Sequence, residues 1–135
     1  MQSPRPKLRL LLADDHPDVL EEIRTLLAVE FDVIGTVGDG AGLVEAARTL
    51  SPDIVVTDLN MPSLNGIEAA RRVLDLDLCR AVVVLTVHKD SELARTALDA
   101  GIRGYVLKEN AGEELIGAVK AAADGRIYVS AAVAR

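Results

Sequence analysis

Polar side chains that suit phosphate and metal chemistry directly follow four short apolar runs of this 135-residue sequence. They are Asp14 with Asp15, Asp58, Thr86 and Lys108. Carboxylates that converge on one pocket repel each other, and this raises at least one pKa unless a cation intervenes. Mg²⁺ suits such a pocket, because it binds one or two carboxylates, keeps several waters and completes its shell with phosphate oxygens. The pattern therefore predicts a Mg²⁺-dependent phosphoryl site.

Each of these residues has a chemical role in such a site. Asp58 is the candidate nucleophile, since a carboxylate can form an acyl phosphate. Mg²⁺ and Lys108 offset the charge of the phosphoryl oxygens, and the hydroxyl of Thr86 hydrogen-bonds one of them. Each residue also has a purely structural explanation, as a helix cap, a turn, a strand end or a solvated charge. A matched metal-and-phosphate set at the ends of four separate strands favours the functional interpretation.

The apolar runs predict the elements that position these side chains. Strands are expected at residues 8–13, 31–37, 54–57, 81–85 and 104–107. Apolar residues recur at helical spacing after each strand. Pro17 suits the first turn of one helix, Asn65 with Gly66 sets up another, and Ser91 can cap a third. Strands that alternate with helices predict an α/β fold with a five-stranded, all-parallel, doubly wound sheet in the order 2-1-3-4-5.

In such a sheet the carboxyl ends of all strands lie at one rim, and ligands bind where the strand order reverses. Strand three lies between strands one and four, about 4.8 Å from each, so Asp15 and Thr86 flank Asp58. Strand five lies two strands away, about 10 Å, a distance that needs a side chain as long as Lys108. His16 and His88 are expected at the margin of this pocket.

Charge and composition narrow the class of protein. A net charge of -6 disfavours direct binding to nucleic acid, which needs clustered Lys or Arg, and one Phe and two Tyr form no platform for stacking bases. The single cysteine, Cys79, cannot form an intramolecular disulfide and is expected to be buried. No apolar run approaches the ~18 residues of a membrane span, so we expect a cytoplasmic protein without a membrane partner.

Four segments together resemble the receiver domain of two-component response regulators. They are residues 13–16 (Ala-Asp-Asp-His), 58–66 (Asp-Leu-Asn-Met-Pro-Ser-Leu-Asn-Gly), 84–88 (Val-Leu-Thr-Val-His) and 104–108 (Gly-Tyr-Val-Leu-Lys). The amino-acid sequence of these motifs is similar to that of the NarL/FixJ group, whose receivers precede a LuxR-type helix-turn-helix domain. The resemblance implies a flavodoxin-like receiver fold over residues 8–123. Residues 1–7 are then a flexible lead-in, and residues 124–135 begin a linker to an output domain absent from this chain.

The resemblance also implies that the domain is a phosphoacceptor switch. Asp58 would accept a phosphoryl group from a sensor histidine kinase. Mg²⁺ would be bound by Asp58, by Asp15 directly, by Asp14 largely through water, and by the backbone carbonyl of Asn60.

Other positions match residues that transmit or tune the signal in the family. Thr86 and Tyr105 are the implied switch pair, which would shift the surface around helix four, strand five and helix five. Asn60 and His88 stand where side chains tune the phosphoryl lifetime. Val87 stands where a small residue is common, and so narrows access to Asp58.

The expected partners and the alternatives follow from this resemblance. Homodimerisation is one expectation, and contact with DNA, for control of transcription, would come only through the absent C-terminal domain. We expect slow loss of the phosphoryl group rather than enzymatic turnover. One alternative is a Mg²⁺-dependent phosphohydrolase of the haloacid dehalogenase kind, but Asn60 stands where its general acid would be. Another alternative is a degenerate receiver that acts only as a docking surface. Such a module would lack at least one of Asp15, Asp58 and Lys108, whereas this sequence has all three.

Overall fold

The computed structural model describes residues 7–133, in which strands alternate with helices. The strands are β1 (Arg9–Ala13), β2 (Asp32–Val37), β3 (Ile54–Thr57), β4 (Ala81–Thr86), β5 (Gly104–Leu107) and β6 (Tyr128–Val129). The helices are α1 (Pro17–Leu27), α2 (Gly40–Leu50), α3 (Gly66–Asp75), α4 (Ser91–Asp99) and α5 (Ala111–Ala123), with a short 3-10 turn, η1 (Lys108–Asn110), before α5. Within residues 7–133, no helix is both long enough and apolar enough to cross a membrane.

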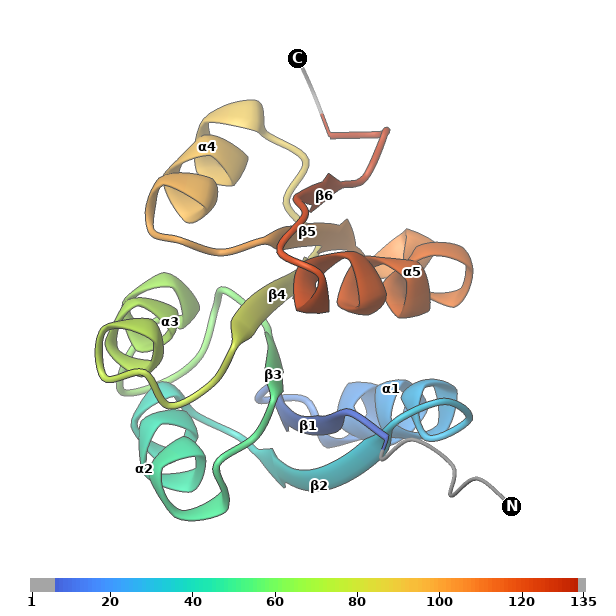
Figure 1. Ribbon diagram of the computed structural model, residues 1–135. Coiled ribbons are helices and arrows are strands. Elements are labelled where there is room, and N and C mark those ends of the chain that lie inside the picture. The colour runs from blue at the N-terminus through green and yellow to red at the C-terminus, as the bar shows by residue number, and fades with distance from the viewer. Residues whose placement is uncertain (1–6, 134–135) are drawn as a thin grey trace.

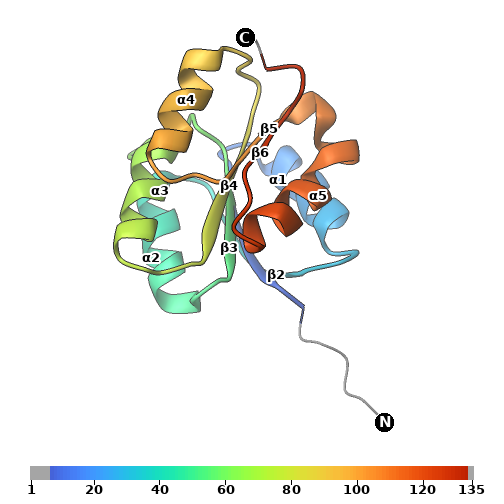
Figure 2. The same cartoon turned by 45° about the horizontal axis from the view of Figure 1, so that its top comes forward.

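The strands form one sheet in the order β2-β1-β3-β4-β5-β6, and all neighbouring pairs are parallel. The predicted order 2-1-3-4-5 is therefore confirmed, with a minor sixth strand added beside β5. Helices α1 and α5 cover one face, whereas α2, α3 and α4 cover the other (Figure 1). Figure 2 shows the same two layers of helices from a tilted view. The domain is thus the doubly wound α/β fold that the sequence predicts.

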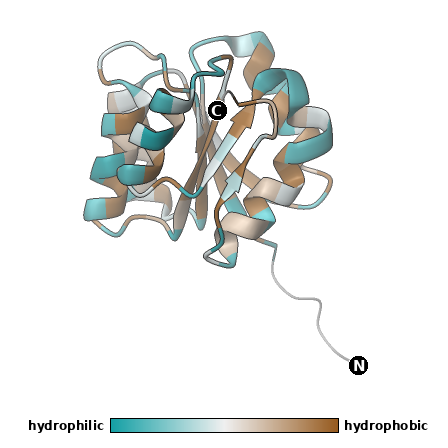
Figure 3. Ribbon diagram, turned by 90° about the horizontal axis from the view of Figure 1, so that it is seen from above, coloured by the Kyte–Doolittle hydropathy of each residue, from teal (hydrophilic) through white to brown (hydrophobic). Residues whose placement is uncertain are grey.

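The two faces of the sheet carry separate apolar cores because successive strand residues point to opposite sides. Leu11 and Val55 belong to the core under α2, α3 and α4, whereas Leu10 and Ile54 belong to the core under α1 and α5. Strands β3, β4 and β5 are buried along their whole length, which explains their continuous apolar sequences. Figure 3 shows the hydrophobic strands between helices whose outer surfaces are more hydrophilic.

Local signals start most of the helices. Pro17 is the first residue of α1, and the side chain of Asn65 caps α3 by accepting a hydrogen bond from the backbone of Glu68. The expected cap at Ser91 is wrong by one residue, because Asp90 precedes α4 and Ser91 is its first residue. These starts place the strand-to-helix loops at one rim of the sheet.

Cys79 is buried, as predicted, and its environment makes a testable difference to its reactivity. Burial raises the pKa of the thiol to about 12, with Asp77 adding to the effect and a hydrogen bond to Ala81 opposing it. Because the thiolate is the reactive form, we expect Cys79 to resist iodoacetamide at pH 8 in the native protein and to react in urea. Mass spectrometry measures the modified fraction, and rapid native labelling would contradict this assignment.

The sheet continues beyond α5 in a segment that we call the C-terminal strap, residues 128–133. Its first two residues form β6, and Ser130 and Val133 are buried. Residues 131–133 form a turn and a bend. The interpretation of residues 124–135 as the start of a linker stays a prediction.

Candidate functional site

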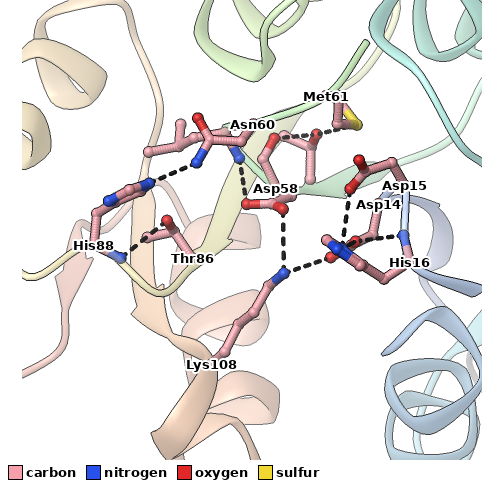
Figure 4. Close-up of polar contacts among 11 residues, drawn as sticks. Asp14, Asp15, His16, Asp58, Asn60, Met61, Thr86, His88 and Lys108 are labelled. Carbon is pink, nitrogen blue, oxygen red and sulfur yellow. Dashed lines mark hydrogen bonds and ion pairs between the residues drawn. The ribbon is translucent and has the colours of Figure 1, made fainter. Parts of the chain in front are cut away.

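The candidate site lies at the carboxyl end of the sheet, where β1, β3 and β4 end side by side. Ala13 pairs with Thr57, and Thr57 pairs with Val84, so the residues that follow β1 and β3 come together. Thr86 pairs with Leu107, the residue before Lys108. The rim thus gathers the residues predicted from four separate strands (Figure 4).

Asp58 is held rigidly although it lies at the end of its strand. Only 5% of the residue is exposed, and its backbone N–H donates to the carbonyl of Ala13 at 2.9 Å. The Leu59 N–H donates to Oδ1 of Asp58 at 2.7 Å. That bond fixes the orientation of the Asp58 carboxylate.

Lys108 bridges two carboxylates across the pocket. Its Nζ lies 2.8 Å from Oδ2 of Asp14 and 3.1 Å from Oδ2 of Asp58. The side chain therefore spans the distance from strand five that the predicted strand order required. Figure 4 shows the ammonium group pointing between the two carboxylates.

The environment of Lys108 keeps it charged. Burial acts to lower the pKa of its ammonium group, but hydrogen bonds and charge attraction from Asp14 and Asp58 outweigh burial and raise that pKa. The pKa of Lys108 is higher in the folded state than in the unfolded state, so its ion pairs contribute their full stability at every pH below the unfolded-state pKa. That contribution is lost only as the pH rises through the folded-state pKa, so the ion pairs are intact at neutral pH.

The acidic residues form a cluster that fits a divalent cation. Asp14, Asp15, His16 and Asp58 each offer a ligand atom, and these atoms all lie within 4.8 Å of one another. Asp14 and Asp58 are buried, whereas Asp15 is exposed, so the cluster opens to solvent on one side. Oxygen donors of this kind suit Mg²⁺.

His16 is more closely involved in this cluster than the sequence suggested. Its Nδ1 lies 3.0 Å from Oδ1 of both Asp14 and Asp15, and its backbone N–H donates to Asp14. The spacing of Asp14 and His16, two residues apart at a strand end, is the signal that could have indicated this contact. His16 thus orients the carboxylates rather than only lining the margin.

Thr86 and Tyr105 meet at the backbone of His88. The hydroxyl of Thr86, which is fully buried, accepts a hydrogen bond from the His88 N–H at 3.2 Å. The hydroxyl of Tyr105 donates to the His88 carbonyl at 2.9 Å. The Tyr105 ring is also fully buried, in the core beneath α4, and burial, with the nearby charge of Asp90, raises its pKa to about 12. One loop residue therefore links the two predicted switch side chains.

Asn60 and His88, the two residues expected to tune phosphoryl lifetime, contact each other beside Asp58. Nδ2 of Asn60 lies 2.6 Å from Nε2 of His88 (Figure 4). Val87, between Thr86 and His88, is 65% exposed. The expectation that Val87 narrows access to Asp58 stays a prediction.

Gly66 allows the loop after Asp58 to close tightly. A Cβ atom at position 66 would lie 2.0 Å from the Asp58 carbonyl oxygen and 2.9 Å from Cα of Leu59. The Gly66 N–H donates to the Leu59 carbonyl at 2.9 Å, which anchors the start of α3 against this strand end. Only glycine leaves room for that approach.

The fold and the site together define a doubly wound α/β domain with an acidic, lysine-bridged pocket at the reversal point of its sheet. Residues 10–120 match the family described as the response regulator receiver domain. The protein belongs to this family, as the sequence motifs predicted.

Similar proteins agree with this assignment. The chain is 36% identical to the transcriptional regulatory protein DegU of Brevibacillus brevis over 125 residues, 91% of this chain and 53% of DegU. It is also 36% identical to the nitrate/nitrite response regulator protein NarL of Escherichia coli K12 over 126 residues, 92% of this chain and 58% of NarL. The chain thus spans little more than half the length of these two relatives.

Solved structures show the same architecture. A LuxR-family two-component response regulator from Aurantimonas has a TM-score of 0.87 at 34% identity, covering 94% of this chain and 92% of that one. The receiver domain of a response regulator NarL from Mycobacterium tuberculosis has a TM-score of 0.85 at 29% identity, covering 90% of this chain and all of that one. The flavodoxin-like receiver fold is confirmed.

Proposed function

We propose that this chain is a phosphoacceptor switch in which Asp58 takes a phosphoryl group from a sensor histidine kinase. The observation that carries the proposal is a buried carboxylate, Asp58, held between an acidic cluster and the ammonium group of Lys108. In the transfer, the phosphorus–nitrogen bond of a phosphohistidine breaks as a bond forms from an Asp58 oxygen to phosphorus. The departing imidazole keeps the electron pair.

The residues around Asp58 fit the requirements of this transfer. Asp14, Asp15 and Asp58 would hold Mg²⁺ with the backbone carbonyl of Asn60, and the bound ion would neutralise charge on the phosphoryl oxygens. Lys108, whose Nζ lies 3.1 Å from Asp58, would neutralise further charge, and the hydroxyl of Thr86 would donate to a phosphoryl oxygen. A turn of Thr86 toward that oxygen would weaken the bond that it now accepts from the His88 N–H.

That turn gives the signal a route to the surface. Thr86 and Tyr105 both bond to the backbone of His88, so movement of one changes the environment of the other. Tyr105 lies in β5 beneath α4, so the surface of α4, β5 and α5 would respond. Phosphorylation acts here as a local change of charge that biases a bistable element.

The proposed partners follow from the family. The phosphoryl donor is a sensor histidine kinase in the cytoplasm, and output would come through a LuxR-type helix-turn-helix domain that controls transcription. Contact with DNA belongs to that domain, since this chain is acidic. Homodimerisation is a further proposal, supported by a solved structure of RcsB dimers bound to DNA that shares this receiver fold.

Labelling with acetyl phosphate tests the function directly. Intact-protein mass spectrometry should show one added phosphoryl group that requires Mg²⁺ and is lost slowly. Continuous release of phosphate over many turnovers would instead favour a Mg²⁺-dependent phosphohydrolase. Against that alternative, the side chain two residues after Asp58 is the amide of Asn60, which contacts His88 and cannot serve as a general acid.

Replacing Asp15 by alanine tests the metal assignment. Asp15 is the exposed carboxylate of the cluster, so its removal opens the cation site without leaving a buried charge unpaired. We expect Mg²⁺ affinity, measured by calorimetry, to fall by about tenfold or more, since loss of even a supporting residue of a metal site costs that much. Asp18→Ala, an exposed aspartate in the first turn of α1, is the control and should bind Mg²⁺ normally. Equal affinity of the two variants would rule out Asp15 as a ligand.

A further inference from the structure

The C-terminal strap (residues 128–133) is fastened to β5 by backbone hydrogen bonds. The Tyr128 N–H donates to the Arg103 carbonyl at 2.9 Å, and the Ser130 N–H donates to the Tyr105 carbonyl at 2.9 Å. Figures 1 and 2 show β6 beside β5, with the chain continuing past it. The strap therefore covers the edge of the sheet that β5 would otherwise expose.

Side chains add to this attachment. The hydroxyl of Ser130, in a residue only 2% exposed, accepts a hydrogen bond from the Leu107 N–H at 3.1 Å and donates to Oε1 of Glu114 at 2.7 Å. The hydroxyl of Tyr128 donates to the same oxygen at 3.0 Å. Val133 is buried in the core that also contains Tyr105. Glu114 thus ties the strap to α5 while Ser130 ties it to β5.

The residues that hold the strap are next to the phosphorylation pocket in the chain. Leu107, whose N–H bonds to Ser130, directly precedes Lys108, whose ammonium bridges Asp14 and Asp58. Tyr105, whose carbonyl bonds to Ser130, is the buried aromatic residue whose hydroxyl reaches the loop after Thr86. Leu107, beside the pocket, and Tyr105, beneath α4, therefore both form hydrogen bonds with Ser130 of the strap.

We propose that attachment of the C-terminal strap and phosphorylation of Asp58 are thermodynamically linked through Ser130 and the end of β5. This linkage rests on the proposed phosphoacceptor function and goes beyond it, since it makes the segment after α5 part of the switch. Thermodynamic linkage makes this coupling reciprocal. If phosphorylation of Asp58 raises the equilibrium constant for strap attachment by some factor, attachment of the strap raises the equilibrium constant for that change at Asp58 by the same factor.

Charge sets the direction of the coupling. Phosphorylated side chains carry about -1.5 to -2 charges, more than a carboxylate, so a phosphoryl group on Asp58 attracts the ammonium of Lys108 more strongly. A more strongly held Lys108 fixes the end of β5, and with it the Leu107 N–H and Tyr105 carbonyl that the strap needs. The strap is therefore more tightly attached in the phosphorylated state.

Hydrogen exchange of the wild-type protein tests the linkage without any substitution near the strap. Beryllium fluoride with Mg²⁺ serves as a reversible phosphoryl mimic at Asp58. We expect it to slow exchange of the Tyr128 and Ser130 amides by about fivefold or more, the lower end of typical coupling between sites. Asp58→Asn should show no such slowing.

The reciprocal experiment measures affinity for beryllium fluoride in strap variants. Ser130→Ala keeps the backbone bonds of the strap and so detaches it only in part, and it should weaken that affinity by up to the factor by which the mimic slows exchange. Residues of α4 and of the strap line a groove that includes both Ser91 and Ser130. Ser91→Ala is the matched control, because Ser91 is exposed and takes no part in the bonds that hold the strap. Tyr128→Phe removes one hydroxyl and leaves the backbone bonds intact, so it should cause a smaller loss and serves if Ser130→Ala does not fold.

Each outcome decides the matter. Slower exchange at the strap together with weaker binding by Ser130→Ala than by Ser91→Ala supports the linkage. Tight binding of the mimic by the wild-type protein with unchanged strap exchange would overturn the linkage and leave the phosphoacceptor function standing. Failure of the wild-type protein to bind the mimic at all would overturn both proposals.

Discussion

Asp58→Asn is expected to abolish phosphorylation by acetyl phosphate to below the detection limit of intact-protein mass spectrometry. A carboxamide keeps the shape of the side chain but lacks the anionic oxygen that attacks phosphorus. The variant should still fold, because Lys108 keeps its ion pair with Asp14 at 2.8 Å. The loss of labelling then reports on chemistry rather than on stability.

A matched control lies at the other end of the same strand. Asp53 precedes β3, and its Oδ2 accepts a hydrogen bond from the Arg9 N–H at 2.8 Å, away from the pocket. Asp53→Asn should therefore be labelled as fully as the wild-type protein. Persistent labelling of Asp58→Asn, at a level similar to that of Asp53→Asn, would mean that another residue accepts the phosphoryl group.

Gly66→Ala is expected to destabilise the domain by about 1–3 kcal/mol or more, which is the usual range for overpacking. The added methyl group would lie 2.0 Å from the Asp58 carbonyl oxygen, where no van der Waals contact is possible, so the backbone must move. Urea denaturation measures the loss of stability. Because the displaced backbone carries Asp58, the rate of labelling should fall as well.

Gly117→Ala is the opposite case and controls for the substitution itself. Gly117 lies inside α5 with open space around its missing Cβ. Alanine is favoured over glycine inside a helix by about 0.8–1.0 kcal/mol, so this variant should gain stability. If Gly66→Ala were as stable as Gly117→Ala, the short distance between position 66 and the Asp58 carbonyl oxygen would not constrain the loop.

The fold was largely predictable because its central strands β3, β4 and β5 are buried on both faces. Residues 54–57 and 81–86 read as continuous apolar runs, and each ends at the polar residue that reaches the rim. The position of Lys108 at Asp58 also followed from strand order and side-chain length alone. These features depend on local periodicity and on topology, and both are visible in sequence.

Features held by individual side-chain contacts were not predictable in this way. The side-chain part of the attachment of β6 depends on the hydroxyls of Ser130 and Tyr128, which both bond to Glu114 from 16 and 14 residues further along the chain. The pairing of Asn60 with His88 depends on the path of two loops that are 28 residues apart. The clearance at Gly66 likewise appears only when the strand end and the helix start are placed together.

The strand order has a consequence for the rate of folding. Strand β2 lies on one side of β1, and every later strand joins the other side in chain order. Strands β4, β5 and β6 therefore each pair with the strand that comes just before them in the chain, across a single crossover. Pairing between neighbours in sequence lowers the mean sequence separation of contacting residues, and this favours fast folding.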